Sequence, residues 1–207
     1  MNAETDFNPG YWNTEELRKF GFKFVGENVL IAKNTTIIGI SNISLGNNIR
    51  IDGYTVINAN SGYLNLGNFI HIGGGCHLAC AGGIEFRNYS GISQGVKIYS
   101  ASDDYSGHFM TNPLVPSEFT NVNYGLVTLH EHVIVGSGSV ILPGLTLLEG
   151  TAVGALTLVN KSIGPWGIYS GAPAKLIKAR SKEILEKRVL LENSLNKTTN
   201  SDKNKLN

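Results

Sequence analysis

Apolar residues recur every six positions along most of this chain. Eighteen positions fall in this register, and after one break the spacing resumes without a slip. These leading residues are Val25, Ile31, Ile37, Leu45, Ile51, Ile57, Leu66, Ile72, Leu78, Phe86, Ile92, Ile98, Leu129, Val135, Ile141, Leu147, Val153 and Val159. Before the break they come in threes, with two or three extra residues between triplets. A fixed short period of this kind is typical of a solenoid.

A second inward position is expected four residues after each leading residue. Its occupants are mostly small or β-branched: Val29, Thr35, Ser41, Ile49, Thr55, Ile70, Cys76, Gly82, Ser90, Val96, Ser139, Thr151 and Thr157. Both positions can face inward only if each step is a short strand followed by a sharp turn. Three strands and three turns then close a triangular coil, and successive coils pair as parallel strands about 4.8 Å apart. A β-sandwich is the alternative, but its turns do not keep one register over so many steps.

Short appendages are predicted at both ends of the repeat. Residues 13–16 have the sequence of a helical capping box, with Trp12 and Leu17 as its hydrophobic staple and Gly21 as its stop. A helix there would cover the open end of the solenoid. Residues 181–196 predict an amphipathic helix, and residues 197–207 a disordered polar tail. The chain is thus divided into a helical cap (1–24), a β-helix (25–178) with an inserted loop (99–128), and a C-terminal helix and tail (179–207).

The composition and charge of the chain exclude several classes of function. The 207 residues suit one domain with appendages, and the formal charge of +1 without a basic run argues against nucleic acid and anionic membranes as partners. The first residues have neither the basic nor the apolar segment of a secretory signal, so none is expected. Cys76 and Cys80 form no C-x-x-C pair, and Cys76 falls on an inward position as a small apolar residue. A cytoplasmic protein with reduced thiols is the expectation.

The break in the repeat, between Ile98 and Leu129, contains the densest group of ionisable residues in the chain. Asp103, Asp104, His108 and Glu118 all lie within it. A loop of this length in a rigid solenoid is more often functional than not.

Several motifs after the break resemble those of the hexapeptide-repeat, acetyl-CoA-dependent sugar acetyltransferases, which include the galactoside and maltose O-acetyltransferases. They are Val135-Gly-Ser-Gly-Ser-Val-Ile-Leu-Pro-Gly144, Ala152-Val-Gly-Ala155, Asn160-Lys161 and Gly171-Ala-Pro-Ala-Lys-Leu-Ile-Lys178. The resemblance implies a left-handed parallel β-helix and a homotrimer with active sites between subunits. The left hand comes from the resemblance alone, because the usual crossover rule favours the opposite hand.

The same resemblance implies a coenzyme site without a metal. The backbone N–H of Ser137 would face the thioester carbonyl as an oxyanion donor. Ala155 would bind the pantetheine arm through its backbone. Asn160, Lys161, Lys175 and Lys178 would contact the end of that arm and the phosphates of the nucleotide. The alternative for the two final lysines is a solvated helix start.

One departure from this family concerns the acceptor. Its O-acetyltransferases place a catalytic histidine just after the strand that here covers residues 97–100, and Asp103 occupies that place. A sugar hydroxyl needs a well-placed base, whereas an amine with a pKa of about 8 is already partly neutral near pH 7 and needs mainly positioning. The missing histidine therefore argues for an amine acceptor.

The loop resembles that of one sub-branch, the N-acyltransferases that act on nucleotide-linked 4-amino-4,6-dideoxysugars. The string Ser-x-Ser-Asp-Asp-Tyr-Ser-Gly, a Thr-Asn-Pro segment and an acidic residue before Thr-Asn carry this likeness. It implies that Asp103, Asp104 or Glu118 holds the amine and accepts its proton. Further expected substrate contacts are Ser93, Tyr105 and His77. The alternative for Asp104 is a simple Asx-turn.

The sequence thus predicts transfer of an acetyl group from acetyl-CoA to the amine of a nucleotide-linked amino-dideoxysugar, by direct attack. The best candidates are dTDP-4-amino-4,6-dideoxyglucose or -galactose, for O-antigen or a similar surface polysaccharide. Sugar O-acetylation with His108 as the base, and a non-catalytic β-helix, are the alternatives. A metal site of the β-helix carbonic anhydrase kind is not expected, since the histidines lack the required spacing.

Overall fold

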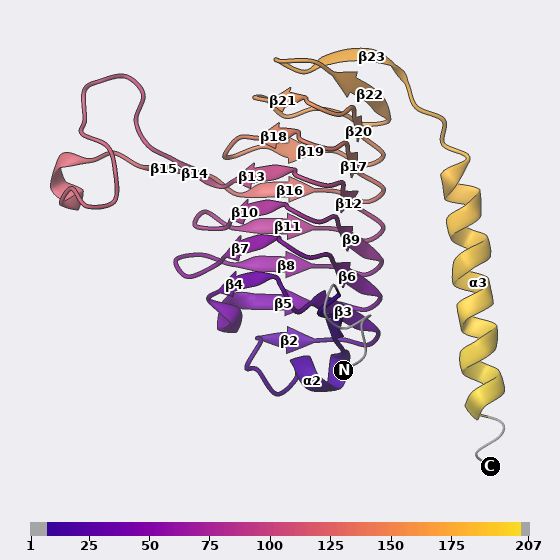
Figure 1. Cartoon of the computed structure of the whole chain (residues 1–207). Helices are drawn as coiled ribbons and strands as arrows, with labels where there is room; N and C mark the ends of the chain where they lie inside the picture. The colour runs from indigo at the N-terminus through magenta and orange to yellow at the C-terminus, as the bar shows by residue number, and fades with distance from the viewer. Residues whose placement is uncertain (1–7, 204–207) are drawn as a thin grey trace.

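Three parallel sheets form a triangular prism that is a left-handed parallel β-helix (Figure 1). The computed structural model describes the backbone of residues 8–203 and the side chains of residues 8–196. Sheet A has nine strands: β1 (Tyr11–Trp12), β3 (Val29–Ala32), β6 (Ile49–Ile51), β9 (Ile70–Ile72), β12 (Gly91–Ile92), β17 (Ile134–Val135), β20 (Ala152–Val153), β22 (Gly167–Ser170) and β23 (Lys175–Ala179). Within it, β1 and β23 pair antiparallel with their neighbours, and the other strands pair parallel.

The other two faces have six strands each. Sheet B contains β2 (Phe24–Val25), β5 (Ile43–Leu45), β8 (Leu64–Leu66), β11 (Ile84–Phe86), β16 (Val127–Leu129) and β19 (Thr146–Leu147). Sheet C contains β4 (Thr36–Ile38), β7 (Val56–Asn58), β10 (His77–Ala79), β13 (Lys97–Tyr99), β18 (Val140–Ile141) and β21 (Leu158–Val159). A small hairpin of β14 (Ala101–Ser102) and β15 (Asn123–Tyr124) leaves the prism between β13 and β16.

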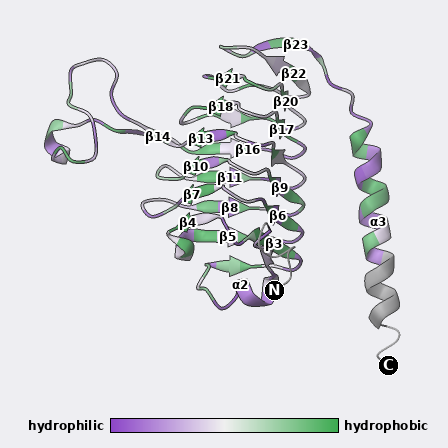
Figure 2. Ribbon diagram, viewed as in Figure 1, coloured by the Kyte–Doolittle hydropathy of each residue, from purple (hydrophilic) through white to green (hydrophobic). Residues whose placement is uncertain are grey.

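The leading residues fill the interior as the six-residue period predicts. All of them are buried except Ile37, which is half-buried in the first coils. They stack in columns, since Ile57, Leu78 and Ile98 are direct cross-strand partners in sheet C. Burial of each such side chain contributes roughly 1.5–3 kcal/mol. In Figure 2 the hydrophobic colour follows the strands of the solenoid.

Two of the predicted second positions are wrong. Ser41 is exposed and Gly82 is half-buried, and their inward places are taken by Ile43 and Ile84. The reason is the extra residues between triplets, which occupy the corner itself. At the first junction they form the short helix η1 (Ile40–Asn42). The inward pair is therefore the leading residue and the residue two positions before it.

Left-handed backbone marks the corner where sheet B leads into sheet A, here called the B–A corner. Six non-glycine residues have φ between 52° and 62° there: Asn28, Asn48, Phe69, Tyr89, His132 and Trp166. Each such residue costs roughly 1–2 kcal/mol. Contacts along the corner offset this cost, because the ring of Tyr89 stacks on Phe69 at 5.0 Å and on His132 at 5.2 Å between centroids.

The predicted capping box is confirmed at the N-terminal end. Asn13 Oδ1 accepts from the N–H of Glu16 at 3.1 Å, and Glu16 Oε2 accepts from the N–H of Asn13 at 2.8 Å. The box begins α2 (Thr14–Leu17), whose Leu17 is buried against the first coil. The helix thereby covers the open end of the prism (Figure 1).

The C-terminal helix is longer than the sequence predicts. Helix α3 (Ile184–Lys203) continues through most of the segment expected to be disordered, and residues 204–207 lie outside the described part. It runs back along the solenoid (Figure 1) and contacts the B–A corner: Arg188 Nη1 lies 3.5 Å from His132 Nε2, and Tyr89 donates to Glu192 Oε1 at 3.0 Å. Among the described helices, none has the length and apolarity needed to cross a membrane.

We predict that this contact makes stability depend on pH. Burial, with Arg188 and Arg180 nearby, lowers the pKa of His132 in the folded protein, although Glu149 and Glu131 partly oppose this. Below the ordinary histidine pKa of about 6.5 the unfolded chain therefore binds a proton that the folded chain resists, and stability falls as the pH drops. Thermal unfolding between pH 7.5 and 5.5 should show this loss.

The matched control is His132→Phe, which keeps a stacking ring but cannot titrate. We expect its unfolding temperature to fall less over the same pH range. An equal fall in both proteins would exclude His132 as the source.

Candidate functional site

Successive turns bring three of the sequence-predicted site residues onto one corner of the prism. The turns that lead from sheet A to sheet C form an edge that we call the A–C corner. Ser93 follows β12, Ser137 follows β17 and Ala155 follows β20. The Ser93 N–H donates to the Val135 carbonyl at 2.8 Å, and the Leu156 N–H donates to the Ser137 carbonyl at 2.9 Å. These residues therefore lie on adjacent coils.

The middle residue of each turn at this corner has an N–H without an acceptor. The column consists of Gly53, Gly74, Gln94, Ser137 and Ala155, and none of these amides donates a hydrogen bond to any described residue. At the B–A corner the equivalent amides of Glu27, Asn47 and Asn68 donate to asparagine side chains of the next coil, at 2.7–2.8 Å. The A–C corner thus keeps a row of backbone donors available for a ligand.

The side chains around Ser137 and Ser93 leave this row accessible. Ser137 Oγ lies 3.4 Å from Gln94 Oε1, and Ser93 Oγ has no hydrogen-bond partner among the described residues. His77 lies on β10 beside Lys97 of β13, on the sheet C side of the corner, with its ring 5.8 Å from that of Tyr99.

The inserted loop carries the predicted acidic residues away from the coils. Its β14–β15 stem projects from the prism, and the loop ends in the short helix η2 (Ser117–Phe119) (Figure 1). Asp103, Tyr105 and Glu118 are all exposed on it. Within one chain the acidic residues and the A–C corner are therefore separate groups.

The carboxylate of Asp104 holds a turn within the inserted loop. Its Oδ1 accepts from the N–H of Ser106 at 2.6 Å and from the hydroxyl of Ser106 at 2.5 Å, while Oδ2 accepts from Asn121 at 3.3 Å. The bonds from Ser106 lower the pKa of Asp104. This is the Asx-turn that was the alternative interpretation of Asp104. The carboxylate of Asp103 has no such partner among the described residues.

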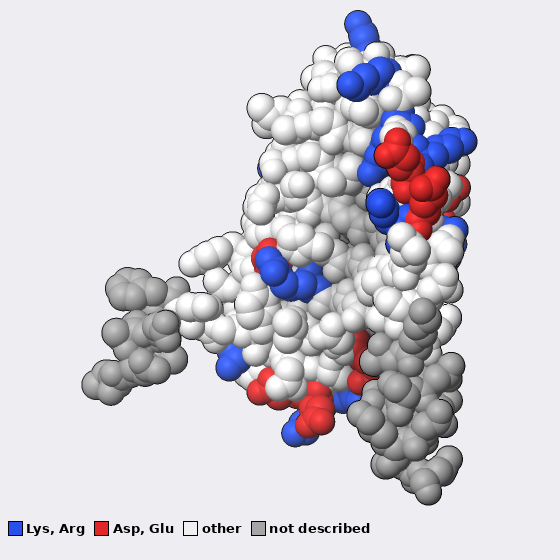
Figure 3. Space-filling view, turned by 90° about the vertical axis from the view of Figure 1, so that its right-hand side faces the viewer, with Lys and Arg blue, Asp and Glu red and all other residues white. Residues whose placement is uncertain are grey.

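The predicted phosphate-binding lysines lie toward the C-terminal end of the prism. Asn160 and Lys161 follow β21, while Lys175 and Lys178 lie on β23, which is a strand and not the start of a helix. All four are exposed, and within the described residues none of the three lysines has an acidic partner. Basic side chains gather at this end of the molecule (Figure 3).

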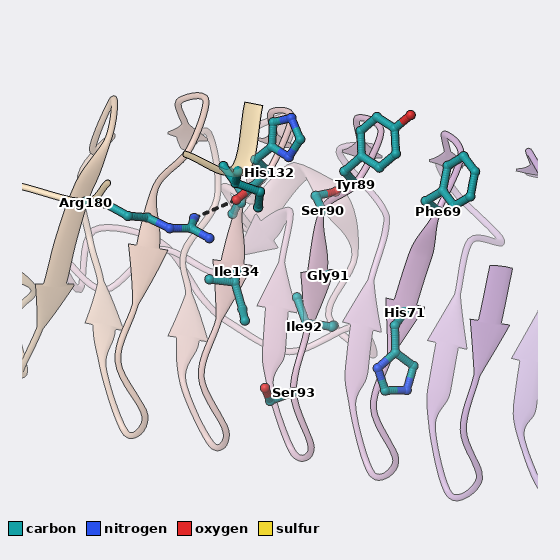
Figure 4. Close-up of a pocket in the computed structure, with 12 residues that line it drawn as sticks. Phe69, His71, Tyr89, Ser90, Gly91, Ile92, Ser93, His132, Ile134 and Arg180 are labelled. Atoms are coloured by element: carbon teal, nitrogen blue, oxygen red, sulfur yellow. Dashed lines mark hydrogen bonds between the residues drawn. The ribbon is translucent and has the colours of Figure 1, made fainter. Parts of the chain in front are cut away.

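The sequence reasoning missed a hollow on the outer face of sheet A. A cavity of about 300 Å3 reaches from Ser93 and Ile134 to the aromatic rings of the B–A corner, with Arg180 at one side (Figure 4). A second hollow of about 390 Å3 continues it toward the N-terminal coils, and the two share Phe69 and His71.

A charged cluster at the edge of this hollow was also missed. Asp52 accepts hydrogen bonds from Arg50 at 2.8 and 3.1 Å, from His71 Nε2 at 2.8 Å and from Tyr11 at 2.9 Å. Burial opposes ionisation of Asp52, but these bonds outweigh it, and the pKa of its carboxyl falls to about 2. The six-residue register could have indicated the cluster, because Arg50 and His71 occupy the same outward position on neighbouring coils.

Neither cysteine is placed for covalent catalysis. Cys76 and Cys80 are buried, and burial raises their pKa values to about 11 and about 12. A thiol nucleophile needs a lowered pKa and access to substrate. Among the described residues no group of three or more metal-ligating side chains converges on one point.

We predict that both thiols are inert in the folded protein. A thiol-reactive dye at pH 8 should label neither Cys76 nor Cys80, and both should react at once in denaturant. Rapid labelling of one thiol in the native protein would contradict this burial and would reopen the possibility of an acyl-cysteine intermediate.

Comparison with known proteins gives close relatives over nearly the whole chain. No protein-family model matches the sequence. The chain is 43% identical over 176 residues to the dTDP-4-amino-4,6-dideoxy-D-glucose acyltransferase of Escherichia coli, covering 85% of this chain and 92% of that protein.

Solved structures agree with this relationship. A serine variant of AntD, an N-acyltransferase from Bacillus cereus, in complex with dTDP-4-amino-4,6-dideoxyglucose and coenzyme A, matches with a TM-score of 0.84 and 39% identity over 93% of this chain and 99% of that one. The serine replaced in it and an aspartate replaced in another AntD structure are ten positions apart. A maltose O-acetyltransferase from Clostridium difficile, 21% identical with a TM-score of 0.55 over 81% of this chain and 74% of that one, shares the fold.

Proposed function

This chain belongs to the family of dTDP-4-amino-4,6-dideoxyglucose acyltransferases, which are acyl-CoA-dependent N-acyltransferases, and we propose that it acetylates the 4-amine of dTDP-4-amino-4,6-dideoxyglucose. The observation that carries the proposal beyond the relationship is the row of free amides at the A–C corner, which includes Ser137 and ends at Ala155. A thioester needs such backbone donors where its carbonyl oxygen gains charge.

The Ser137 amide acts as the oxyanion donor in this proposal. The amine nitrogen attacks the thioester carbon, and the carbonyl oxygen becomes negative in the tetrahedral intermediate. The C–S bond then breaks to give the amide and the thiolate of coenzyme A, which takes up the proton that the nitrogen loses. The Ser137 N–H donates to the oxygen throughout. Because both cysteines are buried with raised pKa values, the transfer is direct, without an acyl-enzyme.

Asp103 and Ser93 hold the amine. In the whole sequence, Ser93 and Asp103 are the only serine and aspartate separated by ten residues in this order, which is the spacing of the two residues varied in AntD. The Ser93 hydroxyl is free to accept from the amine, and the Asp103 carboxylate takes the proton that the attacking nitrogen must lose. Glu118 and Tyr105 extend this acidic side of the site, whereas Asp104 shapes the loop.

Coenzyme A lies along the A–C corner toward the C-terminal end. Ala155 binds the pantetheine arm through its free N–H, one coil beyond Ser137. Asn160 contacts the end of the arm, and Lys161, Lys175 and Lys178 bind the phosphates. Their lack of acidic partners in the described chain leaves their charges available for this.

A homotrimer completes the site. The inserted loop presents Tyr105, Phe109, Met110, Leu114 and Phe119, and Tyr105 and Leu114 are more than 90% exposed. Exposed apolar side chains on a projecting loop mark a protein-binding surface. A neighbouring subunit would cover them and bring Asp103 of one chain to the A–C corner of the next. We further propose that the enzyme works in the cytoplasm, where buried thiols stay reduced, and supplies a surface polysaccharide such as O-antigen.

We predict that Asp103→Asn lowers kcat about 100-fold or more, because the amine loses both its anchor and its proton acceptor. Ser93→Ala should lower kcat/KM for the sugar nucleotide. Both are measured by thiol release from acetyl-CoA with dTDP-4-amino-4,6-dideoxyglucose as acceptor, and affinity for coenzyme A should stay unchanged.

Glu27→Gln is the control, since it neutralises an exposed acid at the B–A corner of the first coils. Full activity of Asp103→Asn would overturn the role of Asp103. Turnover of galactosides that disappears in His108→Ala would instead support O-acetylation.

The trimer is tested by light scattering, where we expect three times the 22.3 kDa chain mass. Phe109→Asp with Leu114→Asp should lower this mass and the turnover together, with the circular dichroism spectrum unchanged. Leu190→Asp, at an exposed leucine of α3, is the control that should stay trimeric. A monomeric wild-type protein with full activity would contradict the shared site.

A further inference from the structure

The free amides of the A–C corner belong to peptides whose carbonyls face the core. A trans peptide directs its N–H and its C=O to opposite sides. Ala155 is exposed and its N–H has no acceptor among the described residues, whereas the Gly154 carbonyl of the same peptide accepts from a buried side chain. Such a carbonyl needs a donor inside the prism, because a buried carbonyl without one is costly.

Buried side chains of the coil before supply these donors. Each lies two residues after a free amide, at an inward position where at most 1% of the residue is exposed. The pairs are Thr55 with the Gly73 carbonyl at 3.2 Å, Cys76 with the Ser93 carbonyl at 3.2 Å, and Ser139 with the Gly154 carbonyl at 2.9 Å. These side chains hold the peptides of Gly74, Gln94 and Ala155 with the N–H outward.

One position of this inner column has no donor in its side chain. It is Val96, which stands where a donor to the Gly136 carbonyl would be. That carbonyl accepts instead from the backbone N–H of Ser139 at 3.4 Å, across the turn. Ser139 therefore contacts both peptides that carry the proposed coenzyme donors. Its N–H holds the peptide of Ser137, and its hydroxyl holds the peptide of Ala155.

The hydroxyl of Ser139 joins the two ends of the turn that presents Ala155. It donates to the carbonyl before Ala155, and it accepts from the N–H of Thr157 at 3.2 Å. The turn also lies close against the coil before it, since even a Cβ at Gly136 would be 2.5 Å from the Ala155 nitrogen. The spacing between the Ser137 and Ala155 amides therefore depends on Ser139.

We propose that Ser139 is a positioning residue for acetyl-CoA. It holds the Ala155 amide outward, at the distance from the Ser137 amide that joins the pantetheine arm to the thioester. Its own side chain touches no substrate, because it is fully buried. A hydrogen bond to the carbonyl of a peptide also polarises that peptide and strengthens its N–H as a donor. The inference rests on the proposed function, which places coenzyme A along these two amides.

Ser139→Ala tests this role. The Gly154 carbonyl and the Thr157 N–H lose their partner, so the turn no longer fixes the Ala155 amide. The Kd of coenzyme A in calorimetry and the KM for acetyl-CoA should each rise about fivefold, as expected for one neutral hydrogen bond. The value of kcat should change less, because the Ser137 peptide keeps its bond from the Ser139 backbone. The KM for the sugar nucleotide should stay as in wild type.

Ser90→Ala is the matched control. Ser90 is also buried, and its hydroxyl donates to the Arg87 carbonyl at 2.6 Å, but at the B–A corner. This variant should unfold at a lower temperature, as Ser139→Ala does, since each loses one buried hydrogen bond. It should nevertheless bind coenzyme A as wild type does. Equal weakening of coenzyme A binding in both variants would overturn the positioning role and leave Ser139 with general stability alone.

Two conservative variants grade the strength of the donor. Ser139→Thr keeps the hydroxyl, and Thr55 and Thr157 show that threonine fits this inward position, so coenzyme A affinity should be restored. Ser139→Cys keeps a weaker donor, as at Cys76, and its affinity should fall between those of the alanine variant and wild type. The comparison of cysteine with threonine also decides the matter if Ser139→Ala does not fold, since equal affinities would overturn the proposal.

The same measurements distinguish this inference from the function on which it rests. A wild-type protein that binds no coenzyme A would contradict the proposed function. A wild-type protein that transfers acetyl groups, together with a Ser139→Ala variant that binds coenzyme A equally well, would overturn the positioning role alone.

Discussion

The structure depends on one constraint: each strand must bury its leading residue directly above the leading residue of the coil below. The hydrogen bonds between parallel strands hold this register, and a slip by one residue would turn every inward side chain outward. Ile57, Leu78 and Ile98 satisfy this constraint, and the same register places all the remaining positions of the repeat above one another as well. The solenoid is therefore a set of columns, and a residue type repeated in one column becomes a surface feature along the axis.

Two corners of the prism stack different residue types in this way. At the B–A corner, asparagine side chains accept from the amides of the coil before, and aromatic rings stack over left-handed backbone. This corner is closed by its own side chains and then covered in part by α3. At the A–C corner the corresponding amides have no acceptor in the described chain. The two corners thus differ in whether side chains of the next coil accept from these amides, as the asparagines of the B–A corner do, or leave them free, as at Gly74 and Ser137.

Much of the fold was predictable from the sequence, because the six-residue period of apolar residues is visible there. It predicted the strands, the buried leading residues and the place of the inserted loop, and the relatives confirmed the acyltransferase family and the amine acceptor. It failed at Ser41 and Gly82, where extra residues in the corner shift the inward pair. It also missed the cluster around Asp52, since Tyr11 reaches it from a strand outside the repeat. The length of α3 was missed because its contacts with Tyr89 and His132 join residues about a hundred positions and fifty positions apart, respectively.

Stacked coils also act as a ruler. Each coil adds about 4.8 Å along the axis, and neighbouring coils touch only each other. On the proposed placement of coenzyme A, the number of coils between Ser137 and Lys178 measures the length of that substrate. Gain or loss of a whole coil would keep the core intact yet change the length of molecule that fits. In such a protein, the number of repeats sets the length of the substrate that fits, independently of the chemistry at the transfer point.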